Sequence, residues 1–205
     1  MHERAIEHLA KSDKVLGRLI RKVGPCRLQT RAIQTPFQAL VCSVTHQQLN
    51  GTAAATILRR VTALYPRRKF PAPQDLLDTP DEKLRGAGLS RAKTAAVKDI
   101  AARAIEGVVP PRRVINGMSD AAIVERLTAI RGVGTWTVEM LLIFTLGRAD
   151  VLPATDYGVR KGFAVTYRRK ELPTPAELLK HGERWRPFRS VASWYLWRSL
   201  EFVAA

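Results

Sequence analysis

Residues 127–146 read LTAIRGVGTWTVEMLLIFTL, and residues 149–163 shortly after them read ADVLPATDYGVRKGF. The first stretch holds a Gly-Val-Gly turn at 132–134 between two segments with apolar residues at helical spacing. Glycines at 132 and 134 permit backbone conformations that other residues avoid, and the N–H groups that open the second helix favour an anion. The stretch therefore predicts two helices joined by a turn that meets phosphate, with Asp156 ten residues beyond its end.

The charge of the whole chain points to the same kind of partner. Its 205 residues include 34 lysines and arginines against 18 aspartates and glutamates, a formal net charge of +16. Such an excess favours a polyanion, nucleic acid above all, over the alternative that the charge serves only solubility. A hydrophobic fraction of 46% is enough for a buried core.

Cysteine content and hydropathy indicate the cellular compartment of the protein. Cys26 and Cys42 are the only cysteines, too few for a four-thiolate iron–sulfur cluster, and no metal-ligand spacing supports zinc. A charged N-terminal segment and the lack of any run of about 20 apolar residues argue against secretion and against membrane spanning. We expect a cytoplasmic protein, associated with the nucleoid if the source is bacterial. The sequence leaves the oligomeric state open, with a monomer favoured.

Helix start signals recur along the chain, while strand-like alternation is nearly absent. Three segments have a capping box with proline at the first helical position: Thr35–Gln38, Thr79–Glu82 and Thr174–Glu177. Single polar residues can cap three further helices, namely Asn50, Ser90 and Ser119. Gly147 is the expected C-cap of the apolar helix before it. The predicted fold is all-α, with about ten short helices.

From the residues alone, two interpretations of the turn and of the aspartate are open. In a helix-hairpin-helix, Val133 packs between two antiparallel helices, and the flanking glycines let the backbone approach DNA phosphate without reading base sequence. The alternative is an ordinary tight turn between helices. Asp156 follows Gly134 by 22 positions and can be a helix N-cap or a catalytic carboxylate.

Taken together, the hairpin and the Pro-x-x-Asp-Tyr segment at 153–157 resemble the helix-hairpin-helix superfamily of DNA base-excision glycosylases. The similarity is closest to the 3-methyladenine DNA glycosylase II family in its compact form, without an N-terminal β domain. Three further segments extend it over nearly the whole chain: 37–54, 84–97 and 183–197. The resemblance implies two helical subdomains flanking an active-site cleft. One is formed by residues 36–147, including the hairpin at 127–146, and the other by residues 1–35 and 148–205.

The resemblance also assigns the base pocket and the catalytic group. Asp156 is the expected catalytic carboxylate, since a fixed carboxylate stabilises the oxocarbenium-like sugar formed in N-glycosidic cleavage. Trp136, Tyr157 and Trp197 stand where the family places pocket aromatics, and plain core packing is the alternative for each. Met140 stands where some relatives have tyrosine, which could alter the substrate range.

The expected DNA contacts come from the hairpin and from the loop after residue 45. In the hairpin they are Gly132, Val133, Gly134 and Thr135, and in the loop they are His46, Gln47 and Gln48. Gln48 matches the side chain that the family inserts into the gap left by a flipped nucleotide. For His46 the alternative is a solvated loop histidine.

Relatives that also cleave the DNA strand have a Schiff-base lysine just after the hairpin, where this chain has Trp136. The resemblance therefore implies a monofunctional glycosylase that hydrolyses alkylated purines, such as 3-methyladenine and 7-methylguanine, from damaged double-stranded DNA. Lys161, the nearest other amine, reads with Arg160 as a phosphate contact or a solvated face.

No cofactor and no metal are expected, and whether a monovalent cation binds the hairpin carbonyls, as in relatives, is left open. A non-catalytic DNA-binding module is one alternative function, and Asp156 counts against it. A glycosylase for mismatched or oxidised bases is another. The missing lysine and the missing cluster cysteines count against that one.

Overall fold

The computed structural model describes residues 2–30 and 34–202. Residues 1, 31–33 and 203–205, which fall within the expected subdomains, lie outside the described residues. The all-α prediction is confirmed, because the described residues form thirteen α-helices and no β-strand. None of the helices in these ranges is long and apolar enough to cross a bilayer. The chain divides into a central unit, residues 31–146, and a terminal unit, residues 1–30 and 147–205.

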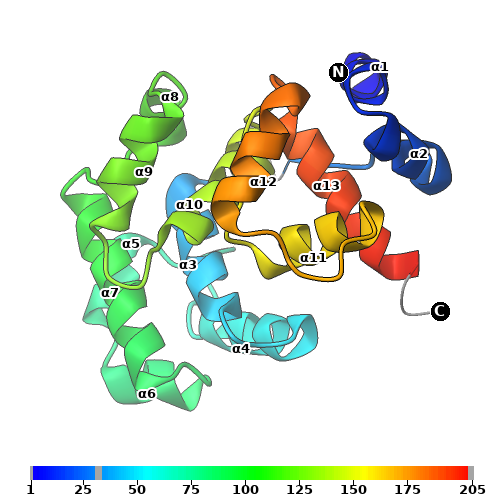
Figure 1. Ribbon diagram of the computed structural model, residues 1–205. Coiled ribbons are helices and arrows are strands. Elements are labelled where there is room, and N and C mark those ends of the chain that lie inside the picture. Colours follow the sequence, from blue (N-terminus) through cyan, green and yellow to red (C-terminus); the bar gives the residue numbers. More distant parts are fainter. Residues whose placement is uncertain (1, 31–33, 203–205) are drawn as a thin grey trace. The chain divides into compact units, whose positions relative to one another are not determined.

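The central unit is built around one long helix, α7. Its described helices are α3 (Pro36–His46), α4 (Gly51–Ala63), α5 (Pro73–Asp78), α6 (Asp81–Gly86), α7 (Arg91–Ile105), α8 (Arg112–Ile115), α9 (Asp120–Thr128) and α10 (Thr135–Leu141), which continues as a π-helical turn, η1 (Leu142–Leu146). Helix α7 packs against α3, α5 and α6, while α10 packs against α3 and α9 (Figure 1). Fully buried side chains such as Leu40, Ile100 and Leu127 form the core between them.

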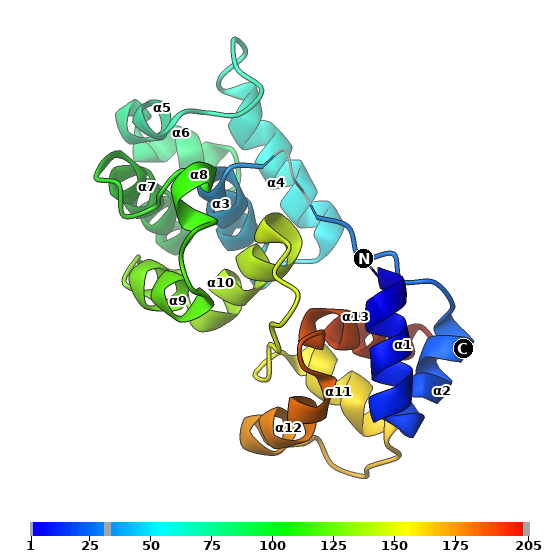
Figure 2. The same ribbon diagram turned by 90° about the horizontal axis from the view of Figure 1, so that it is seen from above.

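The terminal unit combines the two ends of the chain in one core. Its elements are α1 (His2–Ser12), α2 (Lys14–Val23), α11 (Tyr157–Thr166), α12 (Pro175–Gly182), η2 (Glu183–Trp185), α13 (Arg189–Ser199) and η3 (Leu200–Phe202). Helix α13 packs against α1, α2 and α11, so that the N-terminal helices cover a C-terminal one (Figure 2). Trp185 and Tyr195 are the largest of the fully buried side chains.

A buried aspartate, Asp13, ties the terminal unit together. One carboxylate oxygen caps α2, and the other accepts bonds from the Tyr167 hydroxyl (2.6 Å), His181 Nε2 (3.0 Å) and Trp185 Nε1 (3.1 Å). Burial alone would raise the pKa of Asp13. The donated hydrogen bonds outweigh it and hold the pKa of Asp13 well below its usual range. The folded state therefore keeps this carboxylate charged.

Most helix boundaries follow the local signals in the sequence. The capping boxes at Thr35 and Thr174 are confirmed. The three single caps are also confirmed, and each accepts a hydrogen bond from the first turn of its helix: Asn50, Ser90 and Ser119. Gly147 follows η1 with φ +70°, the left-handed conformation expected of a glycine at a helix end.

The capping box expected at Thr79 is wrong. Helix α6 begins at Asp81 with Pro80 as its N-cap, and that cap makes no side-chain hydrogen bond. The Thr79 hydroxyl instead donates to the Asp75 carbonyl (2.7 Å) and lies 2.7 Å from the Tyr65 hydroxyl. Thr79 thus closes the end of α5 and does not cap α6.

Candidate active site

The Gly-Val-Gly turn joins α9 to α10 with Val133 buried beneath it, at 3% exposure. Gly132 has φ +76°, and a Cβ there would lie 2.8 Å from the Cβ of Ala96, so this position requires glycine. Gly134 has φ −91° and ψ 173°, and a Cβ there would meet no atom within 4 Å. The sequence predicts a backbone conformation that other residues avoid at both glycines. This prediction is confirmed at Gly132 and wrong at Gly134.

The loop between α3 and α4 is tied to this turn. The side-chain amide of Gln47 donates to the Gly132 carbonyl (3.0 Å) and to Thr137 Oγ1 (3.2 Å). Gln48 is exposed and has φ +56°, a left-handed backbone conformation that residues other than glycine seldom adopt. His46, also exposed, places Nδ1 2.8 Å from the Cys42 carbonyl. Gln47 thus contacts the hairpin, while Gln48 lies at the tip of the loop.

A cavity of about 190 Å³ in the central unit collects several of the expected residues. Its lining residues are Gln34, Ala39, Cys42, Ser43, His46, Trp136, Met140, Phe144 and Thr145. Trp136, Met140 and Phe144 recur every four residues, so α10 and its π-helical continuation present them on one side. Phe144 was not predicted, although this spacing was the signal that could have found it.

Arg112 of α8 holds the backbone of two residues that line this cavity. Its guanidinium donates to the Gln34 carbonyl at 3.2 Å and to the Thr145 carbonyl. These two carbonyls belong to segments at opposite ends of the central unit's sequence. One planar guanidinium with several donors can bridge them. No local pattern marks this residue, and the sequence reasoning missed it.

In the terminal unit, Asp156 is the N-cap of α11. Its Oδ1 accepts a hydrogen bond from the Val159 amide at 2.7 Å and another from Trp197 Nε1 at 2.8 Å. A Cβ on Gly158 would lie 2.9 Å from Trp197 Cδ1 and 3.1 Å from Asp156 Oδ1. An aspartate can cap a helix without a bond from a tryptophan and without a glycine two residues later. The carboxylate is therefore fixed more firmly than an N-cap requires.

The residues after Asp156 divide between exposed and anchored positions. Tyr157 is 63% exposed, and Lys161 Nζ lies 5.9 Å from the centroid of its ring. Arg160 Nε donates to the Pro173 carbonyl at 2.8 Å. Arg160 is thus tied to the loop before α12, while Lys161 lies beside the aromatic ring.

Residues 41–187 match the family model of the HhH-GPD superfamily of base excision DNA repair proteins. The chain belongs to this superfamily. DNA-3-methyladenine glycosylase 1 of Schizosaccharomyces pombe is 39% identical over 194 residues, which cover 94% of this chain and 85% of that protein.

Two solved structures of superfamily members have similar folds. A 3-methyladenine DNA glycosylase of Schizosaccharomyces pombe, solved in complex with abasic DNA, gives a TM-score of 0.87 at 38% identity and covers 95% of each chain. A DNA-3-methyladenine glycosidase of Bacillus halodurans gives a TM-score of 0.86 at 34% identity, over 98% of this chain and 90% of that one.

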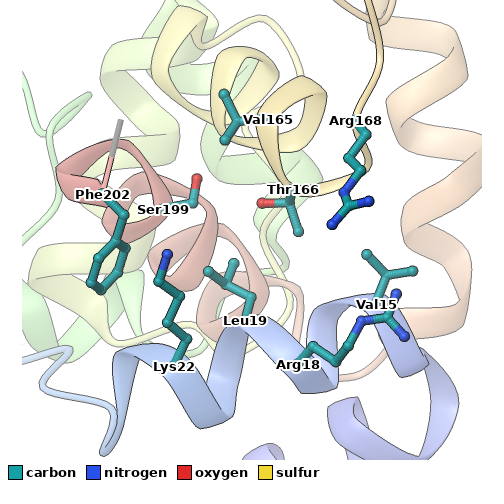
Figure 3. Close-up of a pocket in the computed structure, with 9 residues that line it drawn as sticks. All are labelled: Val15, Arg18, Leu19, Lys22, Val165, Thr166, Arg168, Ser199 and Phe202. Carbon is teal, nitrogen blue, oxygen red and sulfur yellow. The ribbon is translucent and has the colours of Figure 1, made fainter. Parts of the chain in front are cut away.

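This HhH-GPD protein has a further cavity, of about 330 Å³, in its terminal unit (Figure 3). It contains none of the expected site residues, and its cationic lining comes from Arg18, Lys22 and Arg168. The cavity borders the last turn of α11 at Val165 and Thr166, whereas Asp156 caps the first turn. It is therefore distinct from the surroundings of the carboxylate.

Metal ligands do not cluster in the described parts of this protein. No group of three or more histidine, cysteine, aspartate or glutamate side chains there could hold a metal ion. Cys26 and Cys42 do not form a disulfide with each other. Of the expected site residues, Trp136, Met140 and His46 line the central cavity, and Asp156 bonds to Trp197 in the terminal unit. Neither Trp197 nor the exposed Tyr157 lines that cavity.

Proposed function

We propose that this chain is a monofunctional DNA glycosylase that flips alkylated purines, such as 3-methyladenine and 7-methylguanine, out of duplex DNA and hydrolyses their N-glycosidic bonds. The observation that carries the proposal is the Asp156 carboxylate, held at Oδ1 by Trp197 and Val159 in a member of a base-excision superfamily. The names of its relatives and the net charge of +16 support DNA as the substrate.

In this proposal Asp156 stabilises the sugar electrostatically. As the bond from C1′ to the base nitrogen breaks, its electron pair leaves on the base and positive charge develops on the sugar. A carboxylate already held in place by two donors needs little reorganisation to stabilise that charge. Water then bonds to C1′ and gives its proton to the carboxylate. An alkylated purine is cationic and leaves as a neutral base, so it needs little acid catalysis.

The cavity beside Trp136 is the proposed site of the flipped base. Trp136, Met140 and Phe144 supply its aromatic and thioether side, and Trp136 is 38% exposed. An aromatic face attracts a cation by about 0.5–2 kcal/mol, which favours a positively charged purine over a normal one. Ser43 and His46 supply polar groups on the same lining, and these are the proposed partners of the base edges.

The hairpin and the loop before α4 are the proposed DNA grip. Backbone N–H groups of Gly134 and Thr135, at the start of α10, are assigned to a phosphate, which such contacts hold without reading sequence. Gln48 is assigned to the gap that the flipped nucleotide leaves, supported by its exposure at the loop tip. The Gln47 amide already bonds within the protein, which supports a positioning role for it.

The proposed reaction uses water and no cofactor. Trp136 stands where a Schiff-base lysine would have to be, so no amine there can attack the sugar. A monovalent cation on the hairpin carbonyls would share Gly132 O with the Gln47 amide. We further propose a monomer in the reducing cytoplasm, which is compatible with two cysteines that form no disulfide.

Base release from methylated DNA tests this function. The purified protein should release 3-methyladenine and 7-methylguanine, and each release should leave one abasic site in a strand that stays intact until alkali is added. Binding without release would reduce the protein to a DNA-binding module. Strand cleavage without alkali would contradict the hydrolytic mechanism.

A further inference from the structure

The loop that carries Gln48 is held by a lysine that the proposed chemistry does not use. Lys93 is the third residue of α7, and its Nζ donates to the Thr45 carbonyl at 2.8 Å and to the Gln47 carbonyl at 2.7 Å. Both acceptors lie at the C-terminal end of α3, directly before Gln48. Lys93 thus contacts the backbone of the loop and leaves the side chain of Gln48 clear.

The C-terminal end of α3 is a favourable place for the charged amine of Lys93. The last carbonyls of a helix have no partner within the helix, and the negative end of the helix dipole favours a cation there. Partial burial lowers the pKa of Lys93 from its usual value, because the charged amine loses hydration there, and this loss offsets part of the attraction.

Helix α7 also holds the hairpin. Six residues after Lys93, Asp99 accepts a hydrogen bond from the Arg131 amide at 2.8 Å. The Gln47 side chain closes the arrangement by donating to the Gly132 carbonyl. The loop and the hairpin are therefore fixed to one helix and to each other, all within the central unit.

We propose that Lys93 is a positioning residue for base flipping, which fixes the loop at residues 46–50 so that Gln48 can enter the base stack while the hairpin holds phosphate. The left-handed backbone of Gln48, at φ +56°, needs such support, because a strained conformation persists only where its surroundings impose it. This inference rests on the proposed glycosylase function.

Lys93→Met tests the inference, with Lys98→Met as its matched control. Lys98 lies on the same helix and pairs with Asp81 at 2.6 Å, away from the loop. With the lesion in a paired duplex, Lys93→Met removes both charged hydrogen bonds to the loop and should slow single-turnover excision by about tenfold or more. With the same lesion in a single-nucleotide bulge, which is unpaired and leaves no gap opposite a partner base when it flips out, both variants should stay within twofold of wild type. Equal slowing on both substrates, or on neither, would overturn the proposal.

Two further variants connect the effect to the loop. Gln47→Leu removes the hydrogen bond to the Gly132 carbonyl of the hairpin. It should slow excision from the paired duplex as Lys93→Met does, and should not slow excision from the bulged substrate. Adding Lys93→Met to Gln48→Ala should slow excision no further, because Lys93 acts through Gln48. Additive losses would mean that Lys93 acts independently of Gln48 and would overturn the proposal.

A binding measurement separates this inference from the proposed chemistry. In an Asp156→Asn background, fluorescence of 2-aminopurine placed beside the lesion reports unstacking without excision. Lys93→Met should reduce the fluorescence rise on binding, and an unchanged rise would overturn the role of Lys93. If the wild type releases no base, the proposed function fails, while this readout still decides whether Lys93 positions the loop.

Discussion

Replacing Trp197 by phenylalanine keeps an aromatic ring but removes the indole N–H that donates to Asp156 Oδ1 at 2.8 Å. A hydrogen bond to a charged acceptor contributes about 1.5–3 kcal/mol, which corresponds to about 10- to 150-fold in rate if the whole of it acts in the transition state. The Val159 amide continues to hold the same oxygen at 2.7 Å. We therefore expect the lower part of that range, a loss of about 10- to 30-fold.

The assay is single-turnover excision of 7-methylguanine from a defined duplex, with duplex affinity measured separately. Trp197→Phe should lower the rate constant and leave affinity unchanged. Trp194→Phe, on the same helix, is the control, because Trp194 packs edge-on against Tyr195 with ring centroids 4.9 Å apart. It should stay within twofold of wild type.

Gly158→Ala approaches the same contact from the other side, since its Cβ would lie 2.9 Å from Trp197 Cδ1. It should give a comparable loss, and combining it with Trp197→Phe should add little. If Trp197→Phe excises at the wild-type rate while folded, the idea that the indole fixes the carboxylate is refuted.

Three other outcomes follow from the structure. Gly132→Ala should lower the free energy of unfolding by about 1–3 kcal/mol, because of the left-handed φ and the 2.8 Å approach to Ala96. The same variant should bind DNA more weakly in a gel-shift assay. Gly134→Ala is the control and should melt at the wild-type temperature. Asp13→Asn should lower the free energy of unfolding by about 3 kcal/mol, which calorimetry would register as a decrease of about 6–12 °C in Tm. Because folding depresses the pKa of Asp13, this deficit should be full above about pH 5 and shrink as pH falls toward the folded pKa; a deficit independent of pH would contradict the charged acceptor. EDTA should leave base release unchanged, and an EDTA loss restored by a divalent metal would contradict a metal-free reaction.

Local chemistry explains why so many helix starts could be predicted. A capping box involves residues three apart, so Thr35 and Thr174 find their partners whatever the rest of the chain does. Thr79 has the same pattern but bonds to the Asp75 carbonyl of the preceding helix. There two local partners compete, the end of α5 before Thr79 and the start of α6 after it, and the Tyr65 hydroxyl adds a contact on the α5 side that sequence spacing cannot show.

The ties around the candidate site are mostly long-range and were not predictable. Gln47 and Gly132 are 85 residues apart, Lys93 and Thr45 48 apart, and Asp156 and Trp197 41 apart. Sequence patterns identified Gly132 and Asp156 because turn geometry and helix capping are local requirements. They could not show which distant donors hold the loop or the carboxylate, since those contacts depend on how the helices pack.

The central claim, that Asp156 performs the chemistry, is tested most directly by Asp156→Asn on methylated duplex DNA. Asparagine caps a helix about as well as aspartate, so α11 and the duplex affinity should be preserved. An uncharged amide can neither stabilise the developing positive charge nor take a proton from water. We expect the release of 3-methyladenine to fall by about 10²- to 10⁴-fold with binding within threefold of wild type. Release at the wild-type rate would contradict the assignment of Asp156.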